Sequence, residues 1–103
     1  MSTIKIRSKR FAKHTLIRTL IAHPMETGMR TDKTTREVIP ANFIHTLQFL
    51  HNDELLSECQ MGFGISKNPF FSFKITHAKI GDTVTIQWED NLGFKDRLEH
   101  IIQ

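Results

Sequence analysis

Histidine and methionine side chains could hold a metal ion in this chain. His45 and His51 lie six residues apart on one predicted strand, which separates them by about 20 Å of strand rise, so they cannot share an ion. His23 and Met25 stand two residues apart and offer an imidazole nitrogen and a thioether, ligands that suit copper. No third ligand stands beside them. A loop histidine that bonds backbone carbonyls is therefore the stronger interpretation, and we predict no metal and no cofactor.

The single cysteine, Cys59, is the other candidate for chemistry. A thiolate nucleophile needs exposure and a neighbouring base, but Cys59 lies in a predicted strand between Glu58 and Gln60, and an adjacent carboxylate disfavours the thiolate. We predict a small structural hydrophobe. The acidic residues form no recognisable pair, and no Ser-His-Asp order, phosphate-binding glycine loop or CxxC motif occurs. The sequence therefore predicts no catalytic residue and no enzyme.

Two loops combine a stiffening proline with polar groups and one large apolar side chain. They are HPMETG at residues 23–28 and SKNPF at residues 66–70. Stiff loops of this kind suit partner recognition, because little conformational entropy is lost on docking. We predict that the loops lie close together and form one partner-binding surface; its residues are His23, Met25, Glu26, Asn68 and Phe70. The alternative is two ordinary turns whose polar side chains bond the backbone.

The stretch SKNPFFSFKI at residues 66–75 predicts the strand around which the fold is organised. Pro69 marks its entry, and Phe71, Phe73 and Ile75 then alternate with polar residues, which indicates one dry and one wet face. Phe70 falls on the wet face, where a large apolar side chain predicts either a contact with a second sheet or part of a docking surface.

Similar patterns predict six further strands. They lie at residues 3–7, 15–22, 42–50, 56–61, 83–89 and 94–102, with a long polar excursion at 25–37. In phase on their strands we place Ile17 with Ile21, Phe43 with Leu47 and Phe49, and Val84 with Ile86 and Trp88. Seven short strands with turn signals between them predict an all-β, immunoglobulin-like antiparallel β-sandwich. A helix at 97–102 is the minor alternative.

Length and composition limit the other classes of function. The 103 residues suit a single domain, 1–103, and one cysteine excludes an internal disulfide. The net charge is +3, and the basic residues are spread along the chain, which indicates a solvated surface and no nucleic-acid partner. No signal peptide and no apolar run of membrane-spanning length is present, so we expect no membrane insertion.

Four motifs, in this order, resemble the SoxZ family of the bacterial sulfur-oxidation (Sox) system over residues 17–93. They are HPMETG at 23–28, IPANFI at 39–44, SKNPFFSFK at 66–74, and the pattern of Gly81, Asp82, Trp88, Asp90 and Asn91. The resemblance implies a non-catalytic, immunoglobulin-like subunit that forms a heterodimer with SoxY. In that family SoxY carries the sulfur intermediates of thiosulfate oxidation on a cysteine near its C-terminal end.

The resemblance also implies a location and an assembly. We expect a periplasmic protein that is exported together with a signal-bearing SoxY, touches other Sox enzymes transiently, and forms a symmetric homodimer when isolated. The alternative from another class is a periplasmic copper-binding β-sandwich protein that uses His23 and Met25.

Overall fold

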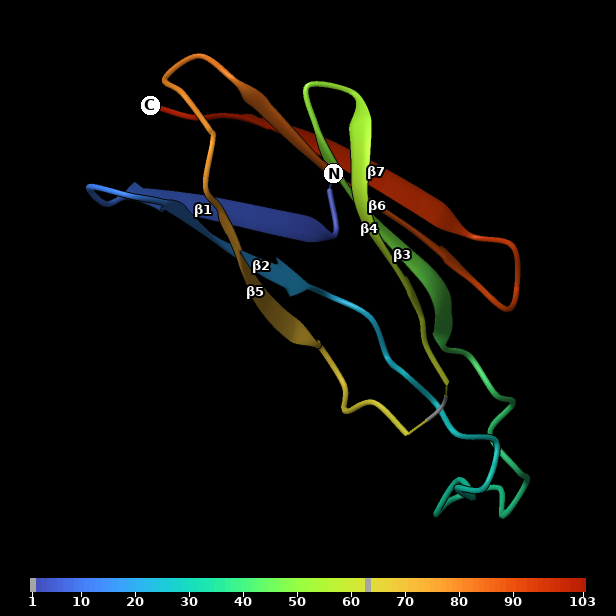
Figure 1. Ribbon diagram of the computed structural model, residues 1–103. Helices are drawn as coiled ribbons and strands as arrows, with labels where there is room; N and C mark the ends of the chain where they lie inside the picture. Colours follow the sequence, from blue (N-terminus) through green and yellow to red (C-terminus); the bar gives the residue numbers. More distant parts are fainter. Residues whose placement is uncertain (1, 63) are drawn as a thin grey trace.

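The computed structural model describes residues 2–62 and 64–103 and shows two antiparallel sheets packed face to face (Figure 1). The strands are β1 (Ile4–Arg10), β2 (Thr15–Ile21), β3 (Ile44–His51), β4 (Glu54–Gln60), β5 (Phe70–Ile75), β6 (Thr83–Asp90) and β7 (Lys95–Ile101). One sheet has the order β1-β2-β5 and the other has the order β4-β3-β6-β7. The predicted immunoglobulin-like sandwich is confirmed. The alternative of a helix at 97–102 is wrong, because β7 pairs with β6 through that segment.

The fourth strand sets this sandwich apart from the constant-type immunoglobulin arrangement, in which the fourth strand pairs with the fifth. Here β4 pairs with β3, because a two-residue turn joins them directly. Asn52 and Asp53 at that turn have φ values of 50° and 67°, the positive pair that a type I′ hairpin turn requires. As a result, one edge of β5 has no strand beside it in the described part of the chain.

The core follows the alternation that the sequence predicts. Ile17, Ile21, Val84, Ile86 and Trp88 are buried between the sheets. On β5 the odd-numbered residues point inward, with Ile75 buried and both Phe71 and Phe73 half-buried. One assignment is wrong in phase: Ile44 and not Phe43 is fully buried, because the pairing of β3 with β6 shifts register between Ile44 and Thr46.

The excursion between β2 and β3 extends beyond the sheets (Figure 1). Two isolated bridges, Glu26 with Asn42 and Thr31 with Val38, fold it back on itself. Most of its residues are exposed, as the polar sequence predicts.

Hydrogen bonds close one side of the sandwich. The Asp96 carboxylate on β7 accepts bonds from the backbone N–H and the hydroxyl of Thr3, both at 2.7 Å, and Trp88 donates its indole N–H to that hydroxyl at 3.1 Å. Ser8 on β1 also bonds His100 on β7 at 2.8 Å. On the opposite side, no hydrogen bond joins β4 to β5 within residues 2–62 and 64–103. The sandwich is therefore closed at β1–β7 and open at β4–β5.

Over the described part of the chain, no helix has the length and apolar character needed to cross a membrane.

Asp82 organises the turns at one end of the sandwich. Its carboxylate accepts bonds from the backbone N–H of Lys79 and from the ring of His51, both at 2.8 Å. The Lys79 N–H, followed by the His51 bond, lowers the pKa of Asp82 from 3.8 to about 2. A carboxyl whose pKa is lower in the folded state stabilises the fold above its unfolded pKa, and this stabilisation is lost as pH falls through the folded pKa.

We predict that Asp82→Asn lowers the stability of the protein at neutral pH and flattens its loss of stability between about pH 4 and pH 2. Urea unfolding at a series of pH values measures both effects. The control is Asp53→Asn, in the exposed turn between β3 and β4, which should keep the acid-dependent loss of the wild type. An unchanged pH profile in Asp82→Asn would show that this carboxylate does not couple folding to pH.

Candidate functional site

The two loops singled out from the sequence meet at one end of the sandwich. Asn68 donates its backbone N–H to the carbonyl of His23, and its side-chain oxygen accepts the N–H of His23, both at 3.0 Å. Beside them, Ile21 donates its N–H to the carbonyl of Pro69 at 3.0 Å. Asn68 has φ of 51°, a conformation that asparagine tolerates better than most residues. The structure therefore confirms that the loops lie together.

His23 lies inside this end of the sandwich and connects the two sheets. Its Nδ1 accepts the backbone N–H of Met25 at 3.1 Å, so the ring proton is assigned to Nε2, which donates to the Asp90 carboxylate at 3.0 Å. Both side chains are at most 3% exposed. The ring also packs edge-on against Trp88, with centroids 5.1 Å apart. His23 leaves β2 and Asp90 ends β6, so this bond ties one sheet to the other.

Asp90 also belongs to this site, although it was not among the site residues predicted from the sequence. Besides the His23 bond, its other oxygen accepts the backbone N–H groups of Leu92 and Phe94, at 3.0 and 2.9 Å. A buried carboxylate is stable only when hydrogen bonds replace its water, and three donors do so here. The only sequence signal was its place in the Asp90-Asn91 pair of the family-like pattern.

Met25 is buried, which corrects its expected role as an apolar anchor on the surface. Its sulfur faces the backbone N–H of Ile44 at 3.4 Å, and its φ is 49°. A non-glycine residue in that region carries strain of order 1 kcal/mol or more, which the surrounding contacts must offset. His23 supplies one such contact through the Met25 N–H. The side chains of His23 and Met25 are therefore buried away from a partner, and they stabilise the conformation of the loop from inside the sandwich.

The same bonds weigh against copper binding by His23 and Met25. Both ring nitrogens of His23 have hydrogen-bond partners, and the Met25 sulfur faces an N–H donor. Metal binding would have to break these bonds and expose a buried pair. Across residues 2–62 and 64–103, no group of three or more His, Cys, Asp or Glu side chains has the geometry of a metal site.

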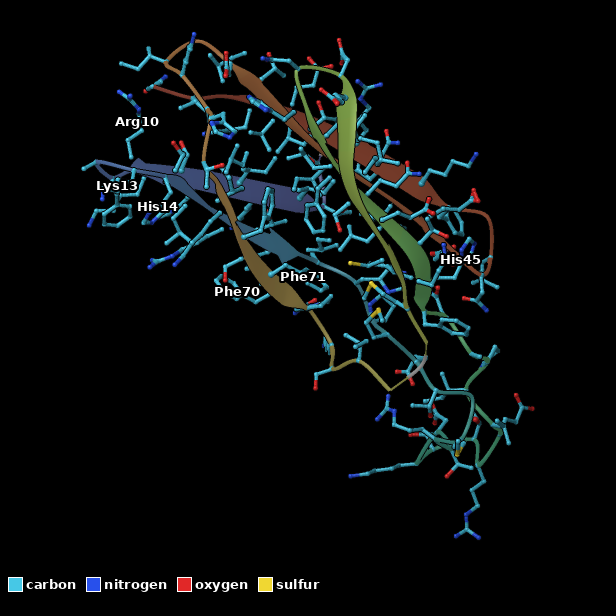
Figure 2. All side chains as sticks on the ribbon, in the orientation of Figure 1. Arg10, Lys13, His14, His45, Phe70 and Phe71 are labelled. Atoms are coloured by element: carbon cyan, nitrogen blue, oxygen red, sulfur yellow. The ribbon has the colours of Figure 1, made fainter. Side chains whose placement is uncertain are left out.

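Glu26, Asn68 and Phe70 differ from these two buried residues. Glu26 forms a two-point ion pair with Arg30, at 2.7 and 3.0 Å, and the Arg30 hydrogen bond lowers the pKa of Glu26. Asn68 is exposed but is held by its bonds to His23. Phe70 is 60% exposed on the outer face of the β1-β2-β5 sheet. Figure 2 shows Phe70 and Phe71 on opposite sides of β5, with Phe71 directed toward the other sheet. The partner-binding role of these three residues stays a prediction.

A groove of about 770 Å³ follows the open β4–β5 side. Aromatic side chains form its floor: the Phe49 ring lies 4.5 Å from Phe73 and 6.4 Å from Phe71, centroid to centroid. Leu56, on the β4 wall, is 47% exposed. We call this feature the open groove; it is lined by Phe49, His51, Glu54, Leu56, Ser57, Cys59, Phe71, Ser72, Phe73, Lys74, Ile75, Thr76 and His77. A β-sandwich normally covers such residues, so the open groove is apolar surface that the described residues leave uncovered.

Cys59 lines the open groove and is half-buried. It pairs with Leu47 across the sheet and packs against the core. This placement agrees with the predicted structural role, and it leaves part of the thiol side open to the groove.

In a comparison with protein families, the family described as sulphur oxidation protein SoxZ matches residues 4–100. Comparison with curated proteins gives no match.

We predict that Asp90→Ala lowers the free energy of unfolding by about 3 kcal/mol, because it leaves three donors at this end without their acceptor. Chemical denaturation measures the loss. The control is Asp32→Ala, since Asp32 also accepts two backbone N–H bonds, from Thr34 and Thr35, but lies exposed in the excursion. Its loss should stay within about 1 kcal/mol. Equal losses in the two variants would count against Asp90 as the tie between the sheets.

Proposed function

The chain belongs to the SoxZ family of sulphur oxidation proteins, and from this we propose that it is a binding subunit that pairs with SoxY. In this proposal SoxY carries the sulfur intermediates on its cysteine, and the present chain stabilises SoxY and presents it to the enzymes of the pathway. The two subunits act in the periplasm and are exported together.

The open groove is the observation that carries the proposal. The β1–β7 side of the sandwich is closed by hydrogen bonds, whereas on the β4–β5 side Phe71 and Phe73 are only half-buried and line a groove over the buried Phe49. Aromatic side chains in a partly formed pocket are typical centres of protein interfaces. We infer that SoxY covers this side and completes the core there.

The edge strands support the same conclusion. Free sheet edges are usually protected by lysine, proline or a bulge, since an unprotected edge pairs with other chains. On β4, the sequence ELLSECQ has no lysine or proline, and Leu55 and Leu56 are both about half exposed. A bulge near Leu50 bends the pairing of β3 with β4 but leaves these leucines uncovered. A strand of this composition is more typical of a permanent interface than of a solvent-exposed sheet edge.

A binding role also fits what the site can do chemically. His23 and Asp90 superficially resemble an acid–base pair, but both are buried and fully engaged in holding the loops. Cys59 forms a wall of the open groove and packs on the core. We therefore propose that the chain contributes surface to the sulfur-oxidation system and performs no catalytic step.

We predict that Leu56→Asp weakens the complex with SoxY at least about tenfold, because it places a charge in the apolar interface. The control is Leu92→Asp, since Leu92 is 55% exposed but lies in the β6–β7 hairpin, away from the open groove. That variant should bind within about twofold of the wild type. Retention on tagged SoxY, followed by a titration, gives the affinities. Equal binding by both variants would exclude the open groove as the SoxY site.

The behaviour of the isolated chain gives a second test of the open groove. We predict that it self-associates as a symmetric dimer through the open groove and that Leu56→Asp makes it monomeric. Sedimentation at micromolar concentrations checks this. A monomeric wild-type chain would count against a large apolar partner face.

The role of Cys59 distinguishes a binding subunit from a subunit that carries sulfur intermediates itself. We predict that Cys59→Ser leaves thiosulfate-dependent turnover of the reconstituted Sox system nearly intact, because the thiol packs on the core and carries no sulfur intermediate of the pathway. The rate of Cys59 alkylation in the wild type should also fall when SoxY binds, since the thiol lines the covered groove. Mass spectrometry reports both alkylation and any sulfur adduct. Adducts on Cys59 during turnover would overturn the binding-subunit proposal.

A further inference from the structure

The outer face of the β1-β2-β5 sheet carries cations without acidic partners in the described part of the chain. We call it the basic face; its charged residues are Lys5, Arg7, Lys9, Arg18 and Lys74, all of them exposed. These residues lie on the wet side of three adjacent strands and come from segments up to 69 positions apart, Lys5 to Lys74. Lys13 extends the same charge onto the β1–β2 hairpin, at the end of the sheet that Figure 2 labels with His14, whereas the Arg10 side chain points to the side of the other sheet.

Charge is divided between the two sheets. The strands β1, β2 and β5 contain six Lys and Arg residues and no Asp or Glu. The strands β3, β4, β6 and β7 contain two Lys and Arg residues and six Asp and Glu. The basic residues are spread along the sequence, as noted above, but strand pairing brings six of them together in one layer.

The same chain pairs its cations elsewhere. On the four-stranded sheet, Arg97 bonds Glu99 at 3.0 Å and Lys95 lies 3.3 Å from Glu89. On the basic face, none of the five cations has an ion-pair partner among residues 2–62 and 64–103. Ion pairing is thus a feature of one outer face and, over these residues, is missing from the other.

The arrangement costs stability. Arg7 lies directly opposite Arg18 in the pairing of β1 with β2. Side chains in such positions have Cβ atoms about 5 Å apart, and like charges there are destabilising. No carboxylate of the described residues pairs with either arginine to offset this repulsion. Like charges that lie opposite each other, with no compensating contact inside the chain, indicate that these positions serve the binding of another molecule.

An apolar pair lies beside the cations. Leu20 pairs with Phe70 across β2 and β5, and Lys5 lies on the other side of Leu20. Leu20 is 40% and Phe70 60% exposed, and both point away from the other sheet. The face therefore combines a flat array of positive charge with one apolar contact at its end, as in interfaces where charge guides the encounter and an aromatic anchor holds it.

We propose that the basic face docks a protein surface of opposite charge, with acidic side chains over the five cations and an apolar group against Leu20 and Phe70. This inference rests on the proposed function, in that the docking protein is an enzyme that visits the SoxY-bound chain. The open groove and the basic face meet at Lys74 and share no other of the charged residues named here, which leaves room for SoxY and the visitor to bind together. On the strands of this face, Phe70 is the single outward-facing aromatic side chain among the described residues, so successive bases find no row of stacking platforms; this favours a protein over a nucleic acid as the occupant.

The test uses the complex of SoxY with this chain, immobilised through SoxY, and the purified Sox enzymes as probes. The charge-reversal variant is Lys5→Glu with Arg18→Glu, which leaves Lys74, a residue of the open groove, unchanged. The control, Lys33→Glu with Lys79→Glu, changes the net charge by the same amount at exposed positions outside the basic face. Association rates are measured at about 20 mM and about 0.5 M salt.

For at least one enzyme, the charge-reversal variant should associate at least about tenfold more slowly than the wild type at low salt, with the difference lost at high salt. The control should change the rate less than about threefold. The melting temperature of the charge-reversal variant should be equal to or above that of the wild type, because the carboxylate introduced by Arg18→Glu would face Arg7. Phe70→Ala should raise the dissociation rate at both salt concentrations.

Retention on SoxY is recorded for every variant and separates this inference from the proposed function. If the wild-type chain fails to bind SoxY, the proposed function fails. If only the charge-reversal variant loses SoxY, the basic face is the SoxY site and the inference is overturned. Equal effects of the two double variants, or no enzyme binding by the wild type, also overturn it. So does tight binding of a single-stranded oligonucleotide that the charge-reversal variant loses.

Discussion

The buried hydrogen bond between His23 and Asp90 is the constraint on which the loop end of this protein depends. It joins the segment that follows β2 to the last residue of β6, so it fixes one sheet against the other. Both residues form further hydrogen bonds: His23 accepts the N–H of the strained Met25, and Asp90 accepts two backbone N–H groups of the turn before β7. These bonds satisfy the polar atoms of His23 and Asp90 at the centre of this end, and the exposed residues above it sit on a rigid base.

The two long sides of the sandwich are unequal, and this inequality links the fold to its proposed use. Asp96 and its bonds to Thr3 seal the β1–β7 side with polar contacts. The hairpin turn at Asn52 and Asp53 commits β4 to the larger sheet, so β5 is left at the edge of the smaller one. For that reason Phe71 and Phe73 stay half-buried at the open groove and are not covered by a neighbouring strand. A turn of two residues thus decides which side of the molecule is left for a partner.

The sequence predicts the local features of this structure well and its long-range contacts poorly. Alternation placed Ile17, Val84 and Ile86 inside and Phe70 outside, because in a strand the face of a residue follows from its position alone. The proximity of the loops followed from the fold class. The partner of His23 did not, because Asp90 lies 67 positions away and no local pattern selects it. The burial of Met25 depends on a positive φ, and the basic face exists only once β1, β2 and β5 are paired.

The pairing of β2 with β5 also shapes how the chain folds. Thr19 meets Phe71, so this contact closes a loop of about fifty residues, whereas short turns close the β3–β4 and β6–β7 hairpins. Contacts distant in sequence form slowly, since the entropy of loop closure is lost before the contact stabilises anything. The pairing of β5 with β2 is therefore one of the slow steps, together with the pairing of β3 with β6, and until it forms β5 is a free strand rich in phenylalanine. A subunit that binds along that edge during synthesis would act as a folding template, and the lifetime of the chain in the cell would then follow the supply of its partner.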